Sequence, residues 1–435
     1  MSENTEVLSE TAAIARDLIR FDTSNYGDGR ANSETEAAEY IGAYLQNLGL
    51  VPRYIDAAPG RTSVVARVRG REPHLPALVV HGHTDVVPAD PEHWSVDPFA
   101  GVVKDGMLWG RGAVDMKNMD AMILTALREL HESGGAPRRD LIIAFFSDEE
   151  NGGEFGSHHV VTHHPEIFEG ATEAISEVGG YSIDVAGRRA YVLQTGEKAL
   201  LWIRLTARGV AAHGSRVIAN NAVTRLAEAV AAVGREEWPV RLTHTTELMV
   251  AELARLQGIE PGTVPPREVV TRTGLAAGFM EAALMTTSNP TMLSAGYKHN
   301  VIPDTASAVI DIRTLPGDED SALARVQQIV GDDIEITVTH RDVGLENSFS
   351  GPIIDSMSQA LLTHDPSAEI VPYLLSGGTD NKALSLLGIR GYGFAPLQLP
   401  PSLDFPAMFH GVDERVPLAA LDFGHRVVHD FLRDY

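Results

Sequence analysis

The chain has 435 residues, 44% of them hydrophobic and 22% charged, so it is long enough for two or three folding units and has an ordinary globular composition. Its formal net charge of −24 argues against nucleic-acid binding, which needs basic patches, and no apolar run is long enough to cross a bilayer. There is no cysteine, which excludes disulfides and thiolate metal ligands.

The first part of the chain alternates helical patterns with apolar strands, which predicts an α/β unit. The acidic N-terminal segment is expected to be an amphipathic helix and lacks the basic start of a secretory signal, so we expect a cytoplasmic protein. A helix at 33–48 is predicted to begin with a capping box from Ser33 to Glu36 and to end at Gly49. We expect another helix at 118–130 and strands at 62–68, 77–80 and 141–147.

The pattern changes after Gly196, where strands begin to alternate apolar and polar residues as half-exposed strands do. Three such strands (200–209, 306–316 and 334–339) and two helices (220–233 and 319–330) predict a small antiparallel sheet with helices on one face. We therefore expect a core domain of residues 1–197 and 344–435, interrupted by an inserted α+β domain of residues 198–343. Residues 236–290 have a helical pattern and are hard to place; the alternative within this scheme is that they lengthen the inserted domain.

The stretch LVVHGHTDVVP, residues 78–88, turns from an apolar strand to three polar residues on alternate positions. His81, His83 and Asp85 would point to one face of the chain. An unpaired carboxylate is costly beside a buried strand, so Asp85 must bind or hydrogen-bond a partner.

Similar groups stand at the ends of other predicted elements. Asp115 follows a glycine-rich turn, Glu149 and Glu150 end the apolar strand 141–147, and Glu177 and His410 each precede glycine. The carboxyl ends of strands in an open α/β sheet meet at one edge, where ligands bind. Adjacent carboxylates repel each other, and one or two divalent cations would relieve the repulsion. Imidazole and carboxylate ligands suit zinc, with cobalt and manganese as substitutes.

Each of these motifs alone is more often part of a solvated loop or an ordinary strand end than a metal site. Their joint occurrence and order resemble the M20 metallopeptidase family, which includes acetylornithine deacetylase, succinyl-diaminopimelate desuccinylase, aminoacylase and a glutamate carboxypeptidase. The motifs that carry the resemblance are HGHTDVVP, GRGAVDMKN, FSDEENGG, ISEVGG, AHGS, HNVIPD, DIRTLP, GGTD and FHGVDE. The resemblance implies a zinc-binding catalytic domain with a mixed, largely parallel sheet, interrupted by an inserted lid domain that often mediates dimerisation.

The resemblance also implies a role for each residue around two zinc ions per chain. Asp85 would accept a hydrogen bond from His83, and Glu149 would be the general base that takes a proton from a bridging water activated by the metals. The metal ligands would be His83 and His410, one on each zinc, with Asp115 bridging the pair, Glu150 completing one zinc and Glu177 the other.

Residues of the inserted domain and its surroundings are the expected substrate contacts. His213 would stabilise the oxyanion, from the other subunit in dimeric relatives, and Asn300 would lie near the same carbonyl. Arg313 would clamp a substrate carboxylate, with a strand-face salt bridge as the alternative. Gly378 and Thr379 would offer further donors to that carboxylate.

The expected activity is hydrolysis of the amide bond of a small N-acyl amino acid or dipeptide. Glu177, where some members of the family have aspartate, tilts the expectation from a dipeptidase or aminopeptidase towards an acyl-amino-acid or carboxypeptidase-like substrate. Two alternatives come from other classes: a binding relative without chemistry, and a two-metal phosphoesterase, for which we find no basic cluster. The expected partners are the small substrate and a second copy of the chain, with no nucleic acid and no membrane.

Overall fold

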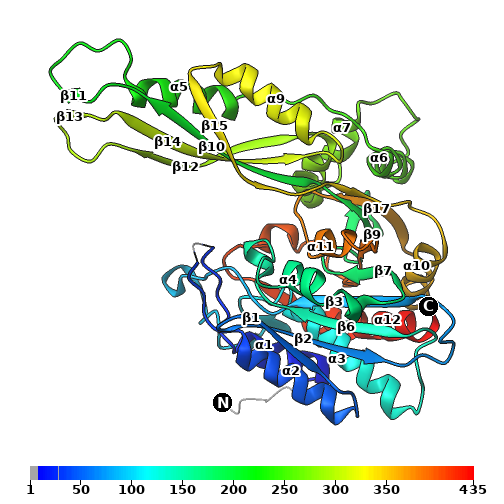
Figure 1. The fold of residues 1–435 in the computed structure, drawn as a ribbon. Coiled ribbons are helices and arrows are strands. Elements are labelled where there is room, and N and C mark those ends of the chain that lie inside the picture. The colour runs from blue at the N-terminus through cyan, green and yellow to red at the C-terminus, as the bar shows by residue number, and fades with distance from the viewer. Residues whose placement is uncertain (1–7, 28) are drawn as a thin grey trace, which may run out of the picture.

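The computed structural model describes residues 8–27 and 29–435, and these form two parts (Figure 1). We call the four-stranded sheet at the top of Figure 1, with its two helices and the short β11–β13 ladder, the lid, and the rest of the described chain the body. The mixed α/β architecture confirms the predicted fold class. The domain boundaries at 197/198 and 343/344 stay a prediction.

The body is built on a sheet of ten strands within the described residues. Its path runs β1-β2-β6-β3-β7-β18-β9-β16, and β8 and β17 also pair with β9. The central strands β6, β3, β7 and β18 are parallel, whereas β1 and β2 run antiparallel at one edge. The strands are β1 (Arg53–Ala58), β2 (Arg61–Val68), β3 (Ala77–His83), β6 (Leu141–Phe146), β7 (Ala171–Ser176), β8 (Ser182–Val185), β9 (Arg188–Glu197), β16 (Leu345–Glu346), β17 (Glu369–Leu375) and β18 (Arg390–Gly393).

Helices cover both faces of this sheet, which is why its central strands are apolar throughout. In β6, Ile143 and Phe145 pack against the larger core under α1, α2, α3 and α12, while Ala144 and Phe146 face a smaller core under α4 and α11. These helices are α1 (Glu10–Ile19), α2 (Thr35–Asn47), α3 (Lys117–Glu132), α4 (Ser157–His163), α10 (Pro352–His364), α11 (Asn381–Ser385) and α12 (Leu418–Asp434). A small sheet of β4 (Val102–Lys104), β5 (Met107–Trp109) and β19 (Arg415–Pro417) lies beside them.

The lid sheet has the order β12-β14-β10-β15, and every pair is antiparallel. Apolar residues alternate along β10 and β14, and one face of the sheet packs under α5 and α9 around its own core. This confirms the predicted strands and both helices, which are β10 (Ala199–Arg208), β11 (Ala212–His213), β12 (Thr287–Ala295), β13 (Val301–Ile302), β14 (Thr305–Thr314), β15 (Ile334–Arg341), α5 (Ala222–Gly234) and α9 (Glu319–Val330).

The segment that the sequence left without a place joins the body. It forms α6 (His244–Leu256), α7 (Pro266–Thr271) and α8 (Ala277–Glu281) before the chain returns to the lid as β12. Met249 and Leu253 of α6 are buried in the larger body core together with Tyr373 of β17. Packing against β9 and β17 therefore ties residues 244–284 to the parallel sheet.

Two local predictions meet different outcomes at the N-terminal helices. The amphipathic helix begins at Glu10, and residues 1–7 of the predicted segment lie outside the described residues. The predicted capping box at the start of α2 is wrong. The N-cap residue is Glu34, and its side chain does not cap the helix, because the carboxylate turns inward and binds Arg61 and Thr84. No helix among the described residues is long and apolar enough to span a membrane, and the cytoplasmic location stays a prediction.

Candidate metal centre

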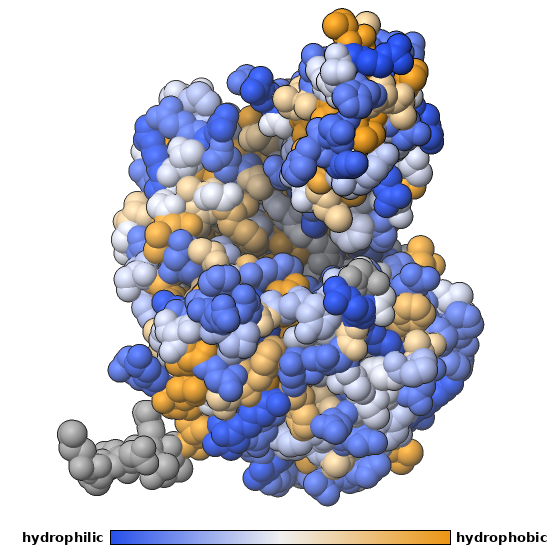
Figure 2. All heavy atoms as spheres, turned by 90° about the vertical axis from the view of Figure 1, so that its left-hand side faces the viewer, coloured by the Kyte–Doolittle hydropathy of each residue, from blue (hydrophilic) through white to orange (hydrophobic). Residues whose placement is uncertain are grey.

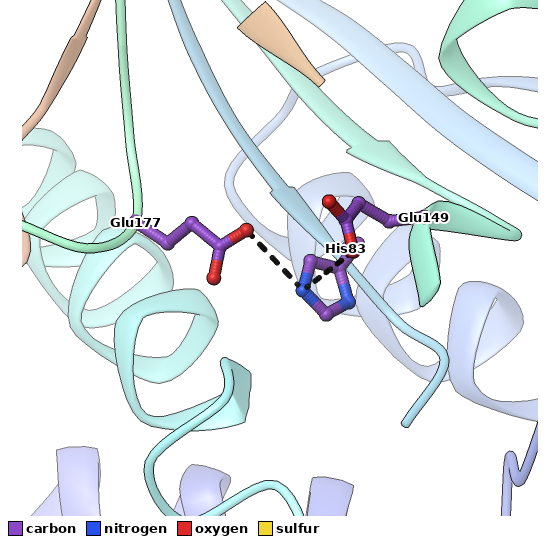
Figure 3. A group of neighbouring side chains, drawn as sticks. All are labelled: His83, Glu149 and Glu177. Atoms are coloured by element: carbon purple, nitrogen blue, oxygen red, sulfur yellow. Dashed lines mark ion pairs between the residues drawn. The ribbon is translucent and has the colours of Figure 1, made fainter. Parts of the chain in front are cut away.

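Three parallel strands, β3, β6 and β7, end at the same edge of the body sheet. His83 and three glutamates lie at or just after these strand ends. His83 is the last residue of β3, Glu149 and Glu150 follow β6, and Glu177 follows β7. In Figure 3, Glu149 and Glu177 both point towards the His83 ring, whose Nε2 lies 3.8 Å and 3.5 Å from their nearest carboxylate oxygens. The strand-end residues therefore converge by the topology of the sheet.

Asp115 stands between two imidazoles. Its Oδ1 is 3.2 Å from His83 Nε2, and its Oδ2 is 3.4 Å from His410 Nε2. His410 Nε2 in turn lies 3.1 Å from Glu150 Oε2. The two oxygens of one carboxylate thus face the two halves of a cluster, one half with His83 and Glu177 and the other with His410 and Glu150.

A buried carboxylate holds the turn that carries Asp115. Glu414 accepts hydrogen bonds from the backbone N–H groups of Gly112, Val114 and Asp115, and it pairs with Arg111 at 2.7 Å. Glu414 lies only four residues after His410, so this contact joins the Asp115 turn to the segment that carries His410. The sequence pattern FHGVDE contained this residue, but nothing in the pattern indicated which turn it would bind.

Asp85 plays the same part for the turn after β6. Its carboxylate accepts hydrogen bonds from Asn25 Nδ2 at 2.8 Å and from the backbone N–H groups of Glu149 at 3.0 Å and Glu150 at 3.2 Å. His83 Nδ1 lies 3.0 Å from the carbonyl oxygen of Asp85 and 3.5 Å from its carboxylate. An Nδ1–H donor to that carbonyl leaves the Nε2 lone pair directed into the cluster.

The cluster holds more negative charge than its surroundings can neutralise. Burial, together with Glu177, raises the pKa of Glu149 well above its usual value, and burial and Asp115 do the same for Glu177. Burial opposes ionisation of Asp115, but hydrogen bonds from His410 and His83 outweigh it and lower the pKa of that carboxyl. Buried carboxylates this close to one another are stable when a cation lies between them.

The donor set fits a divalent metal. In the described part of the chain, His83 with Glu149 and Glu177, and His83 with Asp115 and Glu150, each present donor atoms within 4.8 Å of one another. Glu150 Oε1 is buried and has no hydrogen-bond partner among the described residues. Imidazole nitrogen and carboxylate oxygen are the ligands that zinc takes in hydrolases. Glu149 lies 3.8 Å from His83 Nε2, against 3.2 Å for Asp115 and 3.5 Å for Glu177, and it belongs to one of these donor groups, so geometry alone does not separate a base from a ligand.

A cavity of about 240 Å³ opens over the cluster between body and lid. Figure 2 shows the molecule hollowed on this side, between the lid at the top and the body below. The body contributes the acidic cluster to the wall, and the lid contributes Trp202, Arg313 and His340. The chain can thus hold a small substrate between the candidate metal site and the base of the lid.

The predicted carboxylate contacts reach this cavity in different ways. Arg313 lines it, while its guanidinium makes a two-pronged pair with Asp311 at 2.7 Å and 2.9 Å, so the structure contains both the clamp position and the alternative salt bridge. Gly378 and Thr379 also line the cavity. The backbone N–H and hydroxyl of Thr379 both donate to buried Glu197, at 3.0 Å and 2.7 Å. These two donors are therefore used within the protein and stabilise this part of the cavity wall.

Two predicted residues do not reach the cavity within one chain. His213 ends β11 and Asn300 precedes β13, at the tip of the lid furthest to the left in Figure 1. His213 is exposed, its Nδ1 lies 2.8 Å from Ser215 Oγ, and the carbonyl of Asn300 accepts a hydrogen bond from Gly214. The structure brings the predicted ligands and Glu149 together but leaves His213 and Asn300 at the distal end of the lid.

Comparison with known proteins matches the chain along most of its length. The family model for peptidase family M20/M25/M40 covers residues 79–434. Aminoacylase-1 of Sus scrofa is 28% identical over 401 residues, which cover 87% of this chain and 85% of that protein. The N-fatty-acyl-amino acid synthase/hydrolase PM20D1 of Xenopus tropicalis is 27% identical over 435 residues, which cover 93% of this chain and 81% of that protein.

The solved structures give the same fold. The M20 family metallo-carboxypeptidase Sso-CP2 from Sulfolobus solfataricus superposes with a TM-score of 0.75 at 19% identity, covering 98% of this chain and 99% of that one. The family match, the shared fold and the acidic–imidazole cluster at the sheet edge agree with one another. The chain therefore belongs to peptidase family M20/M25/M40, a family of hydrolases that act on amide bonds.

Proposed function

We propose that the chain is a two-zinc hydrolase that cleaves the amide bond of a small N-acyl amino acid or dipeptide, with Glu149 as general base. The observation that carries the proposal is Asp115, whose two oxygens face two imidazoles, each with a further carboxylate beside it. This is a donor set for two cations that share one bridging ligand. The relationship to aminoacylase-1 supports the acyl-amino-acid substrate.

The proposed ligands divide into two sets around Asp115. His83 and Glu177 would hold one ion, His410 and Glu150 the other, and cobalt or manganese would suit the same donors. Bound zinc supplies a Lewis acid and makes hydroxide accessible near neutral pH. The Asp85 and Glu414 carboxylates hold the ligand-bearing turns, so the chain maintains the geometry through buried hydrogen bonds.

Glu149 is proposed to move the proton. It lines the cavity, and its backbone N–H is held by Asp85, which sets where its carboxylate stands. A carboxylate in this position can accept a proton from the attacking water and deliver it to the leaving nitrogen. Burial raises its pKa, which makes the carboxylate a stronger base than an exposed glutamate.

Arg313 is proposed to bind the substrate carboxylate from the base of the lid. It faces the same cavity as the ligand cluster, and a guanidinium binds a carboxylate through two parallel hydrogen bonds. Asp311 already occupies one side of the guanidinium and holds its plane in place.

A second copy of the chain is proposed to supply His213 and Asn300. Both lie at the lid tip, where β12 is an edge strand that exposes Met292 to 67% and Leu293 to 66%. An exposed apolar edge strand is a surface suited to pairing with a symmetric copy, and the pairing would carry His213 to a carbonyl in the other cavity.

The test is a substrate panel with and without chelator. N-acetyl amino acids, dipeptides and a phosphate monoester would be assayed after zinc loading and after dialysis against a chelator. Hydrolysis of N-acetyl amino acids that is lost with chelator and restored by zinc supports the proposal. Preferred cleavage of dipeptides would favour a dipeptidase of the same family, phosphate-ester cleavage would favour a phosphoesterase, and metal binding without any turnover would favour a binding relative.

A further inference from the structure

The cavity over the acidic cluster has an aromatic side that metal chemistry does not require. Phe279 of α8 and Phe409, which precedes His410, both line it and are both half-buried. Their rings are nearly parallel, with 6° between the planes and 6.2 Å between the centroids. We call these two residues the aromatic wall. Neither ring can ligate a cation or move a proton, so the wall has no part in the hydrolytic step itself.

Neighbouring rings support the wall from behind. Tyr373 stacks on Phe279 with centroids 5.0 Å apart, and Phe405 meets Phe409 edge to face at 5.5 Å. Tyr373 and Phe405 are buried, so the wall continues into the body core. Phe279 and Phe409 line the cavity, where apolar surface is stabilised when another apolar group covers it.

The helical segment before β12 fixes the position of Phe279. Met280, beside it, is buried in the larger body core. The ammonium of Lys198 donates to the carbonyls of Ala282 at 2.9 Å and Met285 at 2.8 Å, which holds the end of the segment. The wall is therefore a preformed surface, as small-molecule sites usually are.

The same lysine relates the wall to the proposed carboxylate clamp. Lys198 immediately precedes β10, in which Leu200 pairs with Arg313 of β14. Leu200 and Arg313 line the cavity with Phe279. The start of β10 thus contacts both the segment that carries Phe279, through Lys198, and Arg313, through Leu200, and both side chains line one cavity. A substrate half whose carboxylate binds Arg313 can therefore place its side chain against the wall.

We propose that Phe279 and Phe409 form the subsite for the side chain of the amino-acid half of the substrate and select a large apolar or aromatic side chain. The inference rests on the proposed amide hydrolysis and names the substrate class within it. N-acetylphenylalanine and N-acetylleucine are then better substrates than N-acetylglycine. An apolar pocket discriminates between such side chains by roughly 10- to 200-fold, which sets the scale of the expected preference.

The experiment compares the wild-type chain with Phe279→Ala, loaded with zinc. The measured quantity is the ratio of kcat/KM for N-acetylphenylalanine to that for N-acetylglycine, and it is expected to fall by at least about tenfold in Phe279→Ala. Phe279→Leu, which keeps apolar bulk, is expected to retain most of the ratio. Leu275→Ala is the matched control, because Leu275 lies in the same segment, is 49% exposed and lines a different cavity.

A second series keeps the amino acid constant and lengthens the acyl group. If Phe279→Ala changes the preference among acyl groups and leaves the side-chain ratio unchanged, the subsite is assigned to the wrong half and the inference is overturned. An equal change in Leu275→Ala also overturns it. Competitive inhibition by free L-phenylalanine relative to glycine, expected to weaken in Phe279→Ala, reports on the subsite without turnover. Absence of all amide hydrolysis in the zinc-loaded wild type would count against the proposed function instead.

Discussion

The edge of the body sheet and the tip of the lid both carry motifs of the same family, yet the structure treats them differently. At the sheet edge, the two oxygens of Asp115 lie 3.2 Å from His83 Nε2 and 3.4 Å from His410 Nε2, with acids on either side. At the lid tip, His213 is exposed, its side chain lies 2.8 Å from Ser215 Oγ in the same turn, and its backbone pairs with Val301 of β13. Residues on a parallel sheet converge because the strands end together, whereas an extended antiparallel sheet carries its end away from the body.

The base of the lid stands between these two cases. Arg313, on β14 next to the body, lines the same cavity as the acidic cluster, although it belongs to the same lid as the exposed tip. Position along the lid strands thus decides whether a lid residue can serve its own chain. Four changes test this difference, and they follow in order of expected effect.

Glu149→Gln tests the sheet edge most strongly. The amide of glutamine cannot accept the proton from the attacking water, so kcat is expected to fall by about 10²- to 10⁴-fold. Metal content, measured by atomic emission on the dialysed protein, should stay at the wild-type value, because Glu149 is not among the proposed ligands. A variant that loses metal along with activity would make Glu149 a ligand, a role that its 3.8 Å distance from His83 Nε2 also permits.

His213→Ala tests the lid tip. If a second copy supplies this histidine as an oxyanion donor, kcat is expected to fall by about 10²- to 10³-fold even though His213 is remote from its own cavity. Mixing His213→Ala with Glu149→Gln and allowing subunits to exchange should restore up to about one quarter of wild-type activity, because each mixed dimer regains one intact site. A mixture that stays inactive, or a chain that sediments as a monomer with full activity, would rule out the shared site.

Asp120→Asn tests how a buried carboxyl group next to the cluster changes the free energy of unfolding with pH. Asp120 is fully buried on α3, both of its oxygens lack a hydrogen-bond partner in the described chain, and burial raises the pKa of its carboxyl to about 8. Above pH ~4 the unfolded chain has released the proton of Asp120, whereas the folded chain keeps it up to about pH 8. Between these two pH values the free energy of unfolding should therefore decrease by about 1.4 kcal/mol per pH unit.

The asparagine variant removes that ionisation and should lack this component of the slope, which makes it more stable than the wild type near pH 8. Urea unfolding of both proteins in chelator, at several pH values, measures the difference. Parallel curves for the two proteins would show that Asp120 ionises normally in the folded state.

Arg313→Ala tests the base of the lid and has the smallest expected effect. KM for N-acetyl amino acids should rise by about tenfold, the scale of one charge-assisted hydrogen-bonding group, while the corresponding amino-acid amides, which lack the carboxylate, should respond little. Arg208→Ala is a suitable control, because Arg208 lies on the same sheet in an exposed pair with Glu335. An unchanged KM would leave Arg313 as the partner of Asp311 alone.

Many strands of the body and the lid could be predicted from the local pattern of apolar and polar residues. The apolar runs at β3 and β6 and the alternating strands of the lid appear where periodicity indicated them, because burial on one or both faces dictates which residues a strand can carry. The capping box at Ser33 failed because a buried partner competed for the side chain next to it: Glu34 binds Arg61 and Thr84. Local pattern does not reveal such competition.

The supporting residues of the site were harder to predict than the ligands. Glu414 and Asn25 lie 299 and 60 residues away from the groups they hold, Asp115 and Asp85, and neither stands at a recognisable strand end. The place of the segment before β12 was equally hidden. Its helical pattern did not reveal that it packs on β17 and presents Phe279 to the cavity.

The sequence was enough to determine the types of secondary-structure element, the family, and the carboxylate and imidazole groups of the candidate metal site. Periodicity and donor groups are properties of short stretches of sequence. Tertiary structure alone decided which of those groups meet. Parallel strands with a common edge brought His83, Glu150 and Glu177 together, and the contacts of Glu414 placed Asp115 and His410 beside them, while the length of the lid carried His213 away. Contacts between distant segments depend on how whole layers pack, and no short window of sequence contains that information.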